Sequence, residues 1–201
     1  MSAKLYLISP PKIELENFLD KLEDAFKTKK ISIFQLRLKN ISDKEIILAS
    51  DKIIPLCQKY QIPFILNDSL DLALKVGANG VHLGGDDGDI KQAREISPKN
   101  FIVGTSCYDS KDMIMKAAES GADYVSLGAF FETKTKKSPG KPTLELLKWC
   151  DNFINVPNVC IGGINNRNYE QLVKNGADFI AVISYIWDHP KGVTYAINSF
   201  S

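Results

Sequence analysis

The sequence has few of the side chains on which nucleophilic and zinc chemistry depend. Its two histidines are His82 and His189, and its four cysteines are Cys57, Cys107, Cys150 and Cys160. No CxxC or Cys/His spacing occurs, so neither a zinc site nor a disulfide framework is indicated, and we expect reduced, mostly buried thiols. His82 stands inside an apolar strand, which favours a hydrogen-bonded core histidine over a catalytic base, and His189 beside Pro190 is typical of a turn. No Ser-His-Asp or Cys-His set is evident.

An excess of one charge and long apolar runs are also absent. The chain carries 25 Lys and Arg against 24 Asp and Glu, a net charge of +1, which gives no general reason to bind nucleic acid or an acidic membrane. Any anion site must therefore be local. No run approaches the roughly 20 apolar residues of a membrane span, and residues 1–5 lead into a strand without an apolar leader, so we expect a cytoplasmic protein. The hydrophobic content of 44% suits one domain over residues 1–201.

Strands and helices alternate along the whole chain. Short apolar runs predict strands near residues 5–8, 31–36, 64–66, 80–83, 101–104, 124–127, 158–161 and 179–183. Helical spacing and capping residues predict helices over 13–29, from Ser42 toward Tyr60, from Asp68 or Ser69 to Val76, from Asp109 or Ser110 through Ala118, over 142–150, after Asn165 or Asn166, and after Pro190. With one helix after each strand, the pattern predicts eight strands and eight helices.

One sequence pattern recurs three times, at residues 76–84, 120–128 and 175–182. In each copy a glycine that can end a helix is followed by a tight turn into a buried strand, as expected for repeated helix-to-strand joints. Eight such units of about 25 residues describe a (β/α)8 TIM barrel. An open doubly wound sheet is the alternative. The barrel is favoured because no GxGxxG follows a strand and because polar residues end nearly every strand.

Polar side chains with complementary charges follow the second, third and fourth strands. Arg37 and Lys39 share strand parity with Gln35, and two cations side by side indicate a site for an anion such as a diphosphate. The alternative is a solvated strand end with surface charges. Asn67 and Asp68 end the third strand.

The acids of the third and fourth strand ends form the second part of this hypothesis. Asp68 and Asp87 offer hard oxygen ligands that suit Mg²⁺, which would bridge to the diphosphate. Asp86 competes with Asp87 for this role, and Asp68 could instead serve only as a helix N-cap.

Phosphate-binding features follow the last three strands. The loop over residues 129–141 alternates hydroxyls with ammonium groups at Thr133, Lys134, Thr135 and Lys136, although an ordinary basic loop would look the same. Gly162 and Gly163 follow the seventh strand, and Ile183 and Ser184 follow the eighth, where barrels commonly bind phosphate through backbone amides. Ser106, at the end of the fifth strand, could hydrogen-bond a ligand. The residues therefore indicate two phosphorylated substrates that meet at one barrel mouth.

Taken together, these segments resemble the thiamine phosphate synthase family over nearly the whole chain. The segments that carry the resemblance are residues 35–39, Asn67-Asp68, residues 80–84 with Asp87, residues 104–106, residues 133–136, residues 161–164 and Ile183-Ser184. The resemblance implies a TIM barrel that joins 4-amino-2-methyl-5-(diphosphooxymethyl)pyrimidine to a phosphorylated hydroxyethyl-methylthiazole, giving thiamine phosphate and diphosphate. It also implies a dissociative reaction, in which no protein nucleophile is needed.

The resemblance assigns a role to each site residue. It implies that Gln35, Arg37, Lys39, Asn67, Ser106 and Lys136 hold the pyrimidine diphosphate, with Arg37, Lys39, Ser106 and Lys136 catalytic. It implies that Asp68 and Asp87 bind Mg²⁺ and that Thr133, Thr135, Gly163, Ile183 and Ser184 hold the thiazole phosphate. The same motifs bring Leu36, Leu38 and Lys134 into the substrate-binding set.

Departures from the family pattern leave two alternatives. Gly85 stands where Gln is usual, Asp86 stands where Glu is frequent, and Tyr108 stands where relatives often carry His. Related thiazole tautomerases use a histidine in that neighbourhood and tend to lose the second metal aspartate, so this chain resembles the synthases more closely. A tautomerase and a non-catalytic phosphate-binding barrel remain the alternatives.

Overall fold

The computed structural model describes residues 4–84, 88–133 and 139–200. Six residues singled out above lie outside the described residues: Gly85, Asp86, Asp87, Lys134, Thr135 and Lys136. No helix in the described part of the chain is long and apolar enough to cross a membrane.

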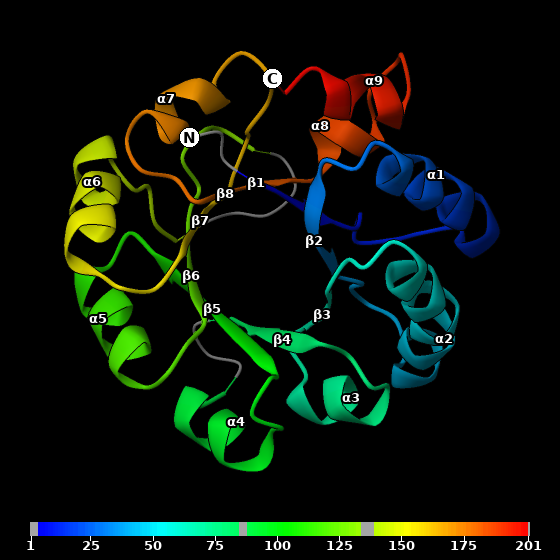
Figure 1. The fold of residues 1–201 in the computed structure, drawn as a ribbon, viewed down its shortest axis with the longest axis horizontal. Coiled ribbons are helices and arrows are strands. Elements are labelled where there is room, and N and C mark those ends of the chain that lie inside the picture. The colour runs from blue at the N-terminus through cyan, green and yellow to red at the C-terminus, as the bar shows by residue number, and fades with distance from the viewer. Residues whose placement is uncertain (1–3, 85–87, 134–138, 201) are drawn as a thin grey trace.

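Eight parallel strands close into a barrel in the order β1 to β8, so the predicted TIM barrel is confirmed and the open doubly wound sheet is excluded (Figure 1). The strands are β1 (Lys4–Ile8), β2 (Ile31–Leu36), β3 (Phe64–Asn67), β4 (Gly80–Leu83), β5 (Ile102–Tyr108), β6 (Tyr124–Leu127), β7 (Asn158–Cys160) and β8 (Phe179–Val182). The barrel closes where β1 pairs with β8.

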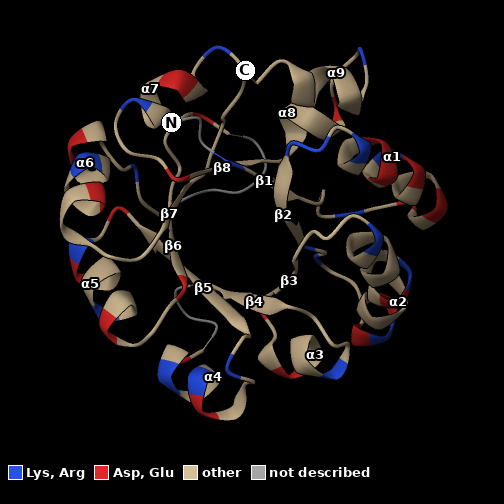
Figure 2. Ribbon diagram, in the orientation of Figure 1, with Lys and Arg blue, Asp and Glu red and all other residues tan. Residues whose placement is uncertain are grey.

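Helices surround the barrel, and the Lys, Arg, Asp and Glu residues lie mainly on this outer ring (Figure 2). The helices are α1 (Leu15–Lys27), α2 (Asp43–Lys59), α3 (Leu70–Lys75), α4 (Ile90–Ile96), α5 (Lys111–Glu119), α6 (Leu144–Phe153), α7 (Tyr169–Val173), α8 (Ser184–Trp187) and α9 (Val193–Asn198). The described residues thus form nine helices, one more than the pattern predicts, because the short α8 follows β8 directly. Trp187 fixes α8 to the barrel, since its Nε1–H donates to the Ile8 carbonyl at 2.7 Å.

Capping side chains set where most of the helices begin. Ser42 and Glu45 form a capping box at the predicted start of α2, and Ser110 caps α5. The prediction for α7 was wrong. Asn168 is the N-cap position, and the Asn165 side chain instead accepts a hydrogen bond from the Arg167 amide at 2.8 Å within the preceding turn.

Strand parity divides the core into two layers. Alternate side chains, such as Leu5 and Leu7 of β1, face the helices and join the large core between strands and helices. The side chains between them face the barrel axis, where a smaller cluster contains Tyr6, Ile8, Tyr124, Val159 and Ala181. The same parity decides which side chains reach the mouth of the barrel at the carboxyl ends of the strands.

Candidate functional site

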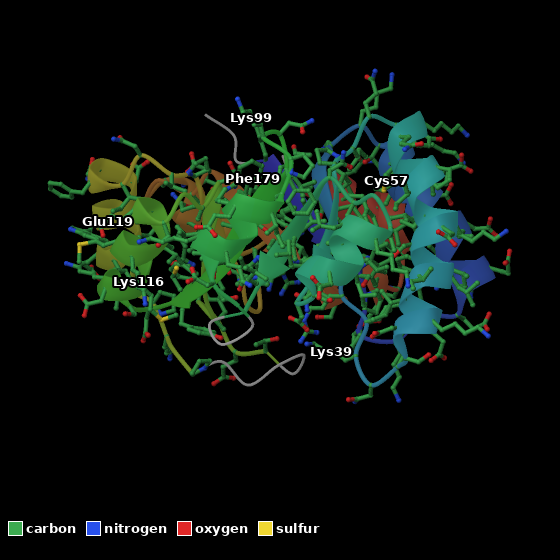
Figure 3. The ribbon with its side chains drawn as sticks, turned by 90° about the horizontal axis from the view of Figure 1, so that it is seen from below. Lys39, Cys57, Lys99, Lys116, Glu119 and Phe179 are labelled. Atoms are coloured by element: carbon green, nitrogen blue, oxygen red, sulfur yellow. The ribbon has the colours of Figure 1, made fainter. Side chains whose placement is uncertain are left out.

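A cavity of about 590 Å³ opens at the carboxyl end of the barrel. In the side view of Figure 3, Lys39, which follows β2, lies on the face opposite Lys99, which precedes β5, and Phe179, the first residue of β8. Ten of the predicted site residues line the cavity: Gln35, Arg37, Lys39, Asn67, Asp68, Ser106, Thr133, Gly163, Ile183 and Ser184. The structure therefore brings together side chains that lie far apart in the sequence.

The β2 strand contributes alternate residues to this cavity. Gln35, Arg37 and Lys39 line it, as their common parity predicts. Leu36 is 1% exposed and belongs to the core between strands and helices, and Leu38 packs against the same core. The side chains of these two leucines thus lie on the other side of the strand, so a role in binding would have to come from their backbone.

Arg37 is a desolvated cation at the cavity wall. Burial lowers the pKa of its guanidinium, and nearby Asp68 partly offsets this effect, but an arginine with a lowered pKa still stays charged at neutral pH. Among the described residues no carboxylate forms an ion pair with Arg37. Its backbone is fixed instead, because the Arg37 amide donates to Ser9 Oγ at 2.8 Å. A half-buried cation of this kind favours an anionic ligand.

Asp68 follows β3, the strand beside β2, and forms an ion pair with Lys39. Its backbone has a positive φ of 70°, and its amide donates to the His82 carbonyl at 2.8 Å, which holds β3 against β4. The cap of α3 is the neighbouring Ser69, whose hydroxyl accepts from the Leu72 amide at 3.3 Å. The alternative in which Asp68 serves only as an N-cap is therefore wrong.

The lining on the β7 and β8 side contains two adjacent glycines among mostly apolar side chains. Gly162 and Gly163 have positive φ values of 104° and 62°. A Cβ on Gly163 would overlap the Glu132 carbonyl and lie 2.9 Å from Phe131 Cβ, so glycine is required where the loop after β6 crosses this turn. Asp188 also lines the cavity here, but no Lys or Arg of the described lining comes from this side.

Four polar side chains form a connected network deeper in the barrel. Tyr6 Oη lies 2.7 Å from Tyr124 Oη, Tyr124 Oη lies 2.9 Å from His82 Nδ1, and His82 Nε2 lies 2.9 Å from Ser106 Oγ. The prediction of a hydrogen-bonded core histidine at position 82 is thus confirmed. Sequence reasoning missed Tyr6 and Tyr124, although a tyrosine with inward parity in each of two apolar strands was a signal for them.

Thiol nucleophiles do not contribute to the described lining of the cavity. All four cysteines are free and buried, as expected, and none of them lines the cavity. Burial raises the pKa of the Cys57 and Cys107 thiols to about 12 and that of Cys150 to about 11. These thiols stay protonated at neutral pH and are unreactive as nucleophiles.

The acids near the cavity are also candidate ligands for a divalent cation. Among residues 4–84, 88–133 and 139–200, no three His, Cys, Asp or Glu side chains gather closely enough to hold a metal. Asp68 and the neighbouring Asn67 place a carboxylate and an amide oxygen at the cavity wall, which are donors that suit Mg²⁺. The donor types therefore fit, and the second acid of the hypothesis, Asp87, lies outside the described residues.

Fold and cavity together define a (β/α)8 barrel protein whose mouth carries two cations on the β2 side and two adjacent glycines after β7, a lining that suits anionic ligands. The family model described as thiamine monophosphate synthase matches residues 5–186. The chain belongs to this family.

Individual relatives agree with this assignment. A thiamine-phosphate synthase of Rhodospirillum centenum is 41% identical over 98% of this chain and 96% of its own length. One of Pelagibacter ubique is 43% identical over 93% of this chain and 90% of its own. The solved structure of a thiamine phosphate pyrophosphorylase from Pyrococcus furiosus is 33% identical, covers 98% of this chain and 93% of its own, and superposes with a TM-score of 0.84. The chain is thus an enzyme of the thiamine-phosphate synthase type.

Proposed function

We propose that this enzyme condenses 4-amino-2-methyl-5-(diphosphooxymethyl)pyrimidine with 4-methyl-5-(2-phosphooxyethyl)thiazole, forming thiamine phosphate and releasing diphosphate. One observation carries the proposal: a single cavity has a cationic wall formed by Arg37 and Lys39 and, facing it, a wall of glycine backbone. Two different phosphorylated groups can bind there at once. Family membership supports the same reaction.

The cationic wall is the proposed site for the pyrimidine diphosphate. Arg37 suits two phosphate oxygens at once, and Lys39 adds a point charge, with Gln35 and Asn67 as neutral donors on the same wall. Lys136 and Ser106 complete the proposed set. These groups bind most strongly when the bond to carbon breaks and negative charge accumulates on the diphosphate.

Asp68 and Asp87 are the proposed ligands of a Mg²⁺ ion at this wall, in agreement with the carboxylate and amide oxygens at Asp68 and Asn67. The ion would supply Lewis-acid stabilisation of the leaving diphosphate. Asp68 is paired with Lys39, and the Lys39 and Asp68 side chains are 38% and 35% exposed, so their mutual attraction is worth about 1 kcal/mol or less. Both groups can therefore exchange partners when the substrate binds.

The glycine wall is the proposed site for the thiazole phosphate. Gly163, Ile183 and Ser184 line it, and Thr133 lies in the loop after β6. Thr135 and Lys134 of the same loop belong to the proposed set. Backbone amides and hydroxyls hold a phosphate without adding a charge that would compete with the leaving group on the other wall.

The proposed reaction is dissociative. Diphosphate departs, a pyrimidine cation forms, and the thiazole nitrogen captures it. Because no cysteine lines the described cavity and burial keeps the thiols protonated, a covalent thiol intermediate is disfavoured. The rate is gained by positioning the two substrates and by stabilising the charge of the leaving group.

A direct assay tests the function. The purified protein is incubated with both substrates and Mg²⁺, with a chelator in a parallel sample, and thiamine phosphate and diphosphate are quantified. Equal amounts of both products, lost on chelation, are expected. An isomerised thiazole without coupling would instead identify a tautomerase, and binding without turnover would identify a non-catalytic barrel. Tyr108 lines the cavity where a tautomerase needs a histidine, which favours the synthase.

A further inference from the structure

The hydrogen-bonded network inside the barrel has a geometry that the binding roles above do not use. It links β1, β6, β4 and β5 through Tyr6, Tyr124, His82 and Ser106, with successive distances of 2.7, 2.9 and 2.9 Å. All four side chains line the cavity, but Tyr6 and Tyr124 are only 2% and 3% exposed, whereas Ser106 is partly exposed. The network therefore leads from a buried end at Tyr6 to a more accessible end at Ser106.

The number of protons in this network is fixed by burial. Desolvation raises the pKa of both phenols well above their ordinary range, so each tyrosine keeps its proton at neutral pH. The two phenols supply two protons, and a neutral imidazole supplies one N–H and one acceptor nitrogen. The direction of donation along the network is then a choice between two arrangements.

In the first arrangement each donor at the buried end of the network has an acceptor. Tyr6 donates to Tyr124, Tyr124 donates to His82 Nδ1, and His82 donates from Nε2 to Ser106 Oγ. The Ser106 proton is left to point into the cavity.

In the reverse arrangement, Ser106 donates to His82 and the Tyr6 proton is left over at the buried end. Among the described residues, Tyr124 is the hydrogen-bond partner of the Tyr6 hydroxyl, so this proton would have no protein acceptor. A doubly protonated imidazole fails in the same way, because it must donate to Tyr124, which must then donate to Tyr6. Leaving a buried donor unsatisfied is costly, so the first arrangement is favoured.

We propose that donation runs in one direction from Tyr6 to Ser106, fixing His82 as the Nε2–H tautomer and making the Ser106 hydroxyl a donor toward an acceptor atom of the ligand. His82 is then a positioning residue that acts through Ser106. The identity of this ligand as the pyrimidine diphosphate rests on the proposed function, whereas the direction of hydrogen-bond donation does not. Its chemical consequence is that the site at Ser106 selects for a hydrogen-bond acceptor.

A glycine supports this network by close approach. The Tyr124 ring stacks on the His82 ring with centroids 5.6 Å apart and an interplanar angle of 16°. Gly104 of β5 lies between these two residues, since it pairs with His82 of β4 on one side and with Tyr124 of β6 on the other. A Cβ on Gly104 would overlap the Tyr124 ring. Gly104 thus leaves the space in which Tyr124 can reach His82.

Nitrogen NMR tests the direction without any assay of activity. The chain has two histidines, so a sample with ¹⁵N-labelled imidazoles shows two sets of ring signals, and a His189→Gln variant assigns them. We expect the His82 signals of a neutral ring with Nδ1 unprotonated and Nε2 protonated. A ring protonated at Nδ1, at both nitrogens, or averaged between tautomers would overturn the proposal.

Tyr124→Phe tests the origin of the direction. It removes the hydroxyl that donates to His82 Nδ1, so the His82 nitrogen signals should move toward an average of the two tautomers. In Tyr6→Phe the signals should stay those of the Nε2–H tautomer, because the buried Tyr124 proton would still find its acceptor only at His82. Tyr195→Phe, at a 48% exposed tyrosine of α9, is the matched control and should leave the His82 signals unchanged. Identical His82 signals in Tyr124→Phe and the parent protein would contradict the proposed cause.

Kinetics test the action through Ser106. A His82→Gln side chain can still offer an N–H near the Nε2 position, whereas His82→Leu cannot. We expect His82→Leu to lower kcat by roughly tenfold to a hundredfold, with His82→Gln recovering much of it. In a Ser106→Ala background the His82→Leu effect should disappear, while a merely structural role would give additive losses and parallel changes in thermal unfolding. If the parent protein forms no thiamine phosphate, the proposed function fails and the NMR result still decides the direction of the network.

Discussion

The two walls of the cavity offer different groups to the two proposed anionic ligands, and the difference matches what each ligand would do in the proposed reaction. On the β2 and β3 wall, Arg37 and Lys39 bring full charges on side chains, and Asp68 brings an opposite charge. On the β7 and β8 wall, Gly162 and Gly163 present backbone, with no Lys or Arg among the described lining there. A group that leaves with new charge needs strong charges near it, whereas a group that is only held needs shape and amide donors.

Loss of the acid on the charged wall should have the largest effect. Asp68→Ala removes the partner of Lys39 and a proposed Mg²⁺ ligand, so kcat/KM should fall by about a thousandfold, or about 4 kcal/mol. Asp188→Ala removes an acid from the opposite wall and is the matched control, with an expected loss of about tenfold or less. Steady-state kinetics at saturating Mg²⁺ measure both. Equal losses would mean that the two walls do not divide the work in this way.

The choice of the second acid sharpens the same comparison. Asp87→Ala should lower activity by about a hundredfold or more, and Asp86→Ala by much less, because only one of the adjacent acids is expected to bind the metal. The dependence of the rate on Mg²⁺ concentration distinguishes them, since loss of a ligand raises the concentration needed for half-maximal activity. Comparable losses for both variants would refute the assignment of Asp87.

A substitution in the glycine wall should change KM for the thiazole phosphate and leave KM for the pyrimidine diphosphate unchanged. Gly163→Ala forces a side chain against the Glu132 carbonyl and Phe131 and strains a positive φ of 62°, so KM for the thiazole phosphate should rise about tenfold. Gly77→Ala imposes a similar strain at φ 70°, where a Cβ meets nothing within 4 Å, and controls for strain alone. A rise in KM for the pyrimidine diphosphate instead would reverse the assignment of the walls.

The smallest effect is expected on the outer side of β2. Leu38→Ala should leave both KM values within about twofold, because the Leu38 side chain packs against the core beneath the helices and does not line the cavity. The free energy of unfolding should fall by about 2 kcal/mol, as for other large-to-small changes in a core. Chemical denaturation measures the stability loss. A large change in KM would show that Leu38 takes part in binding through its side chain.

Local patterns predicted much of this fold because strand parity and cap chemistry act over short distances. The capping box of Ser42 and Glu45 and the C-terminal glycines of the repeated joints are visible in a few adjacent residues. The helix α8 was missed because its four residues continue directly from β8 and carry no cap side chain. The predicted position of the α7 N-cap was wrong because several asparagines lie in one turn. Asn168 occupies the N-cap position, and its side chain donates to the Gly163 carbonyl.

The charged residues of the candidate site could be predicted from the sequence, whereas its aromatic residues could not. Arg37, Lys39 and Asp68 follow apolar runs, and charged side chains at the carboxyl ends of buried strands are visible in the sequence as candidates for a ligand site. Leu36 and Leu38 entered the predicted set only by adjacency to these residues, and their side chains lie in or against the core. Tyr6 and Tyr124 read as ordinary apolar strand residues, and only the closed barrel brings their hydroxyls together across 118 positions of sequence.

Those two tyrosines have a further consequence for traffic through the enzyme. Their rings meet edge to face, with centroids 5.7 Å apart, and they line the cavity among the side chains that fill the barrel axis. We therefore expect both substrates to enter and both products to leave at the carboxyl ends of the strands. The molecule bound nearer to the two tyrosines should then enter first and leave last.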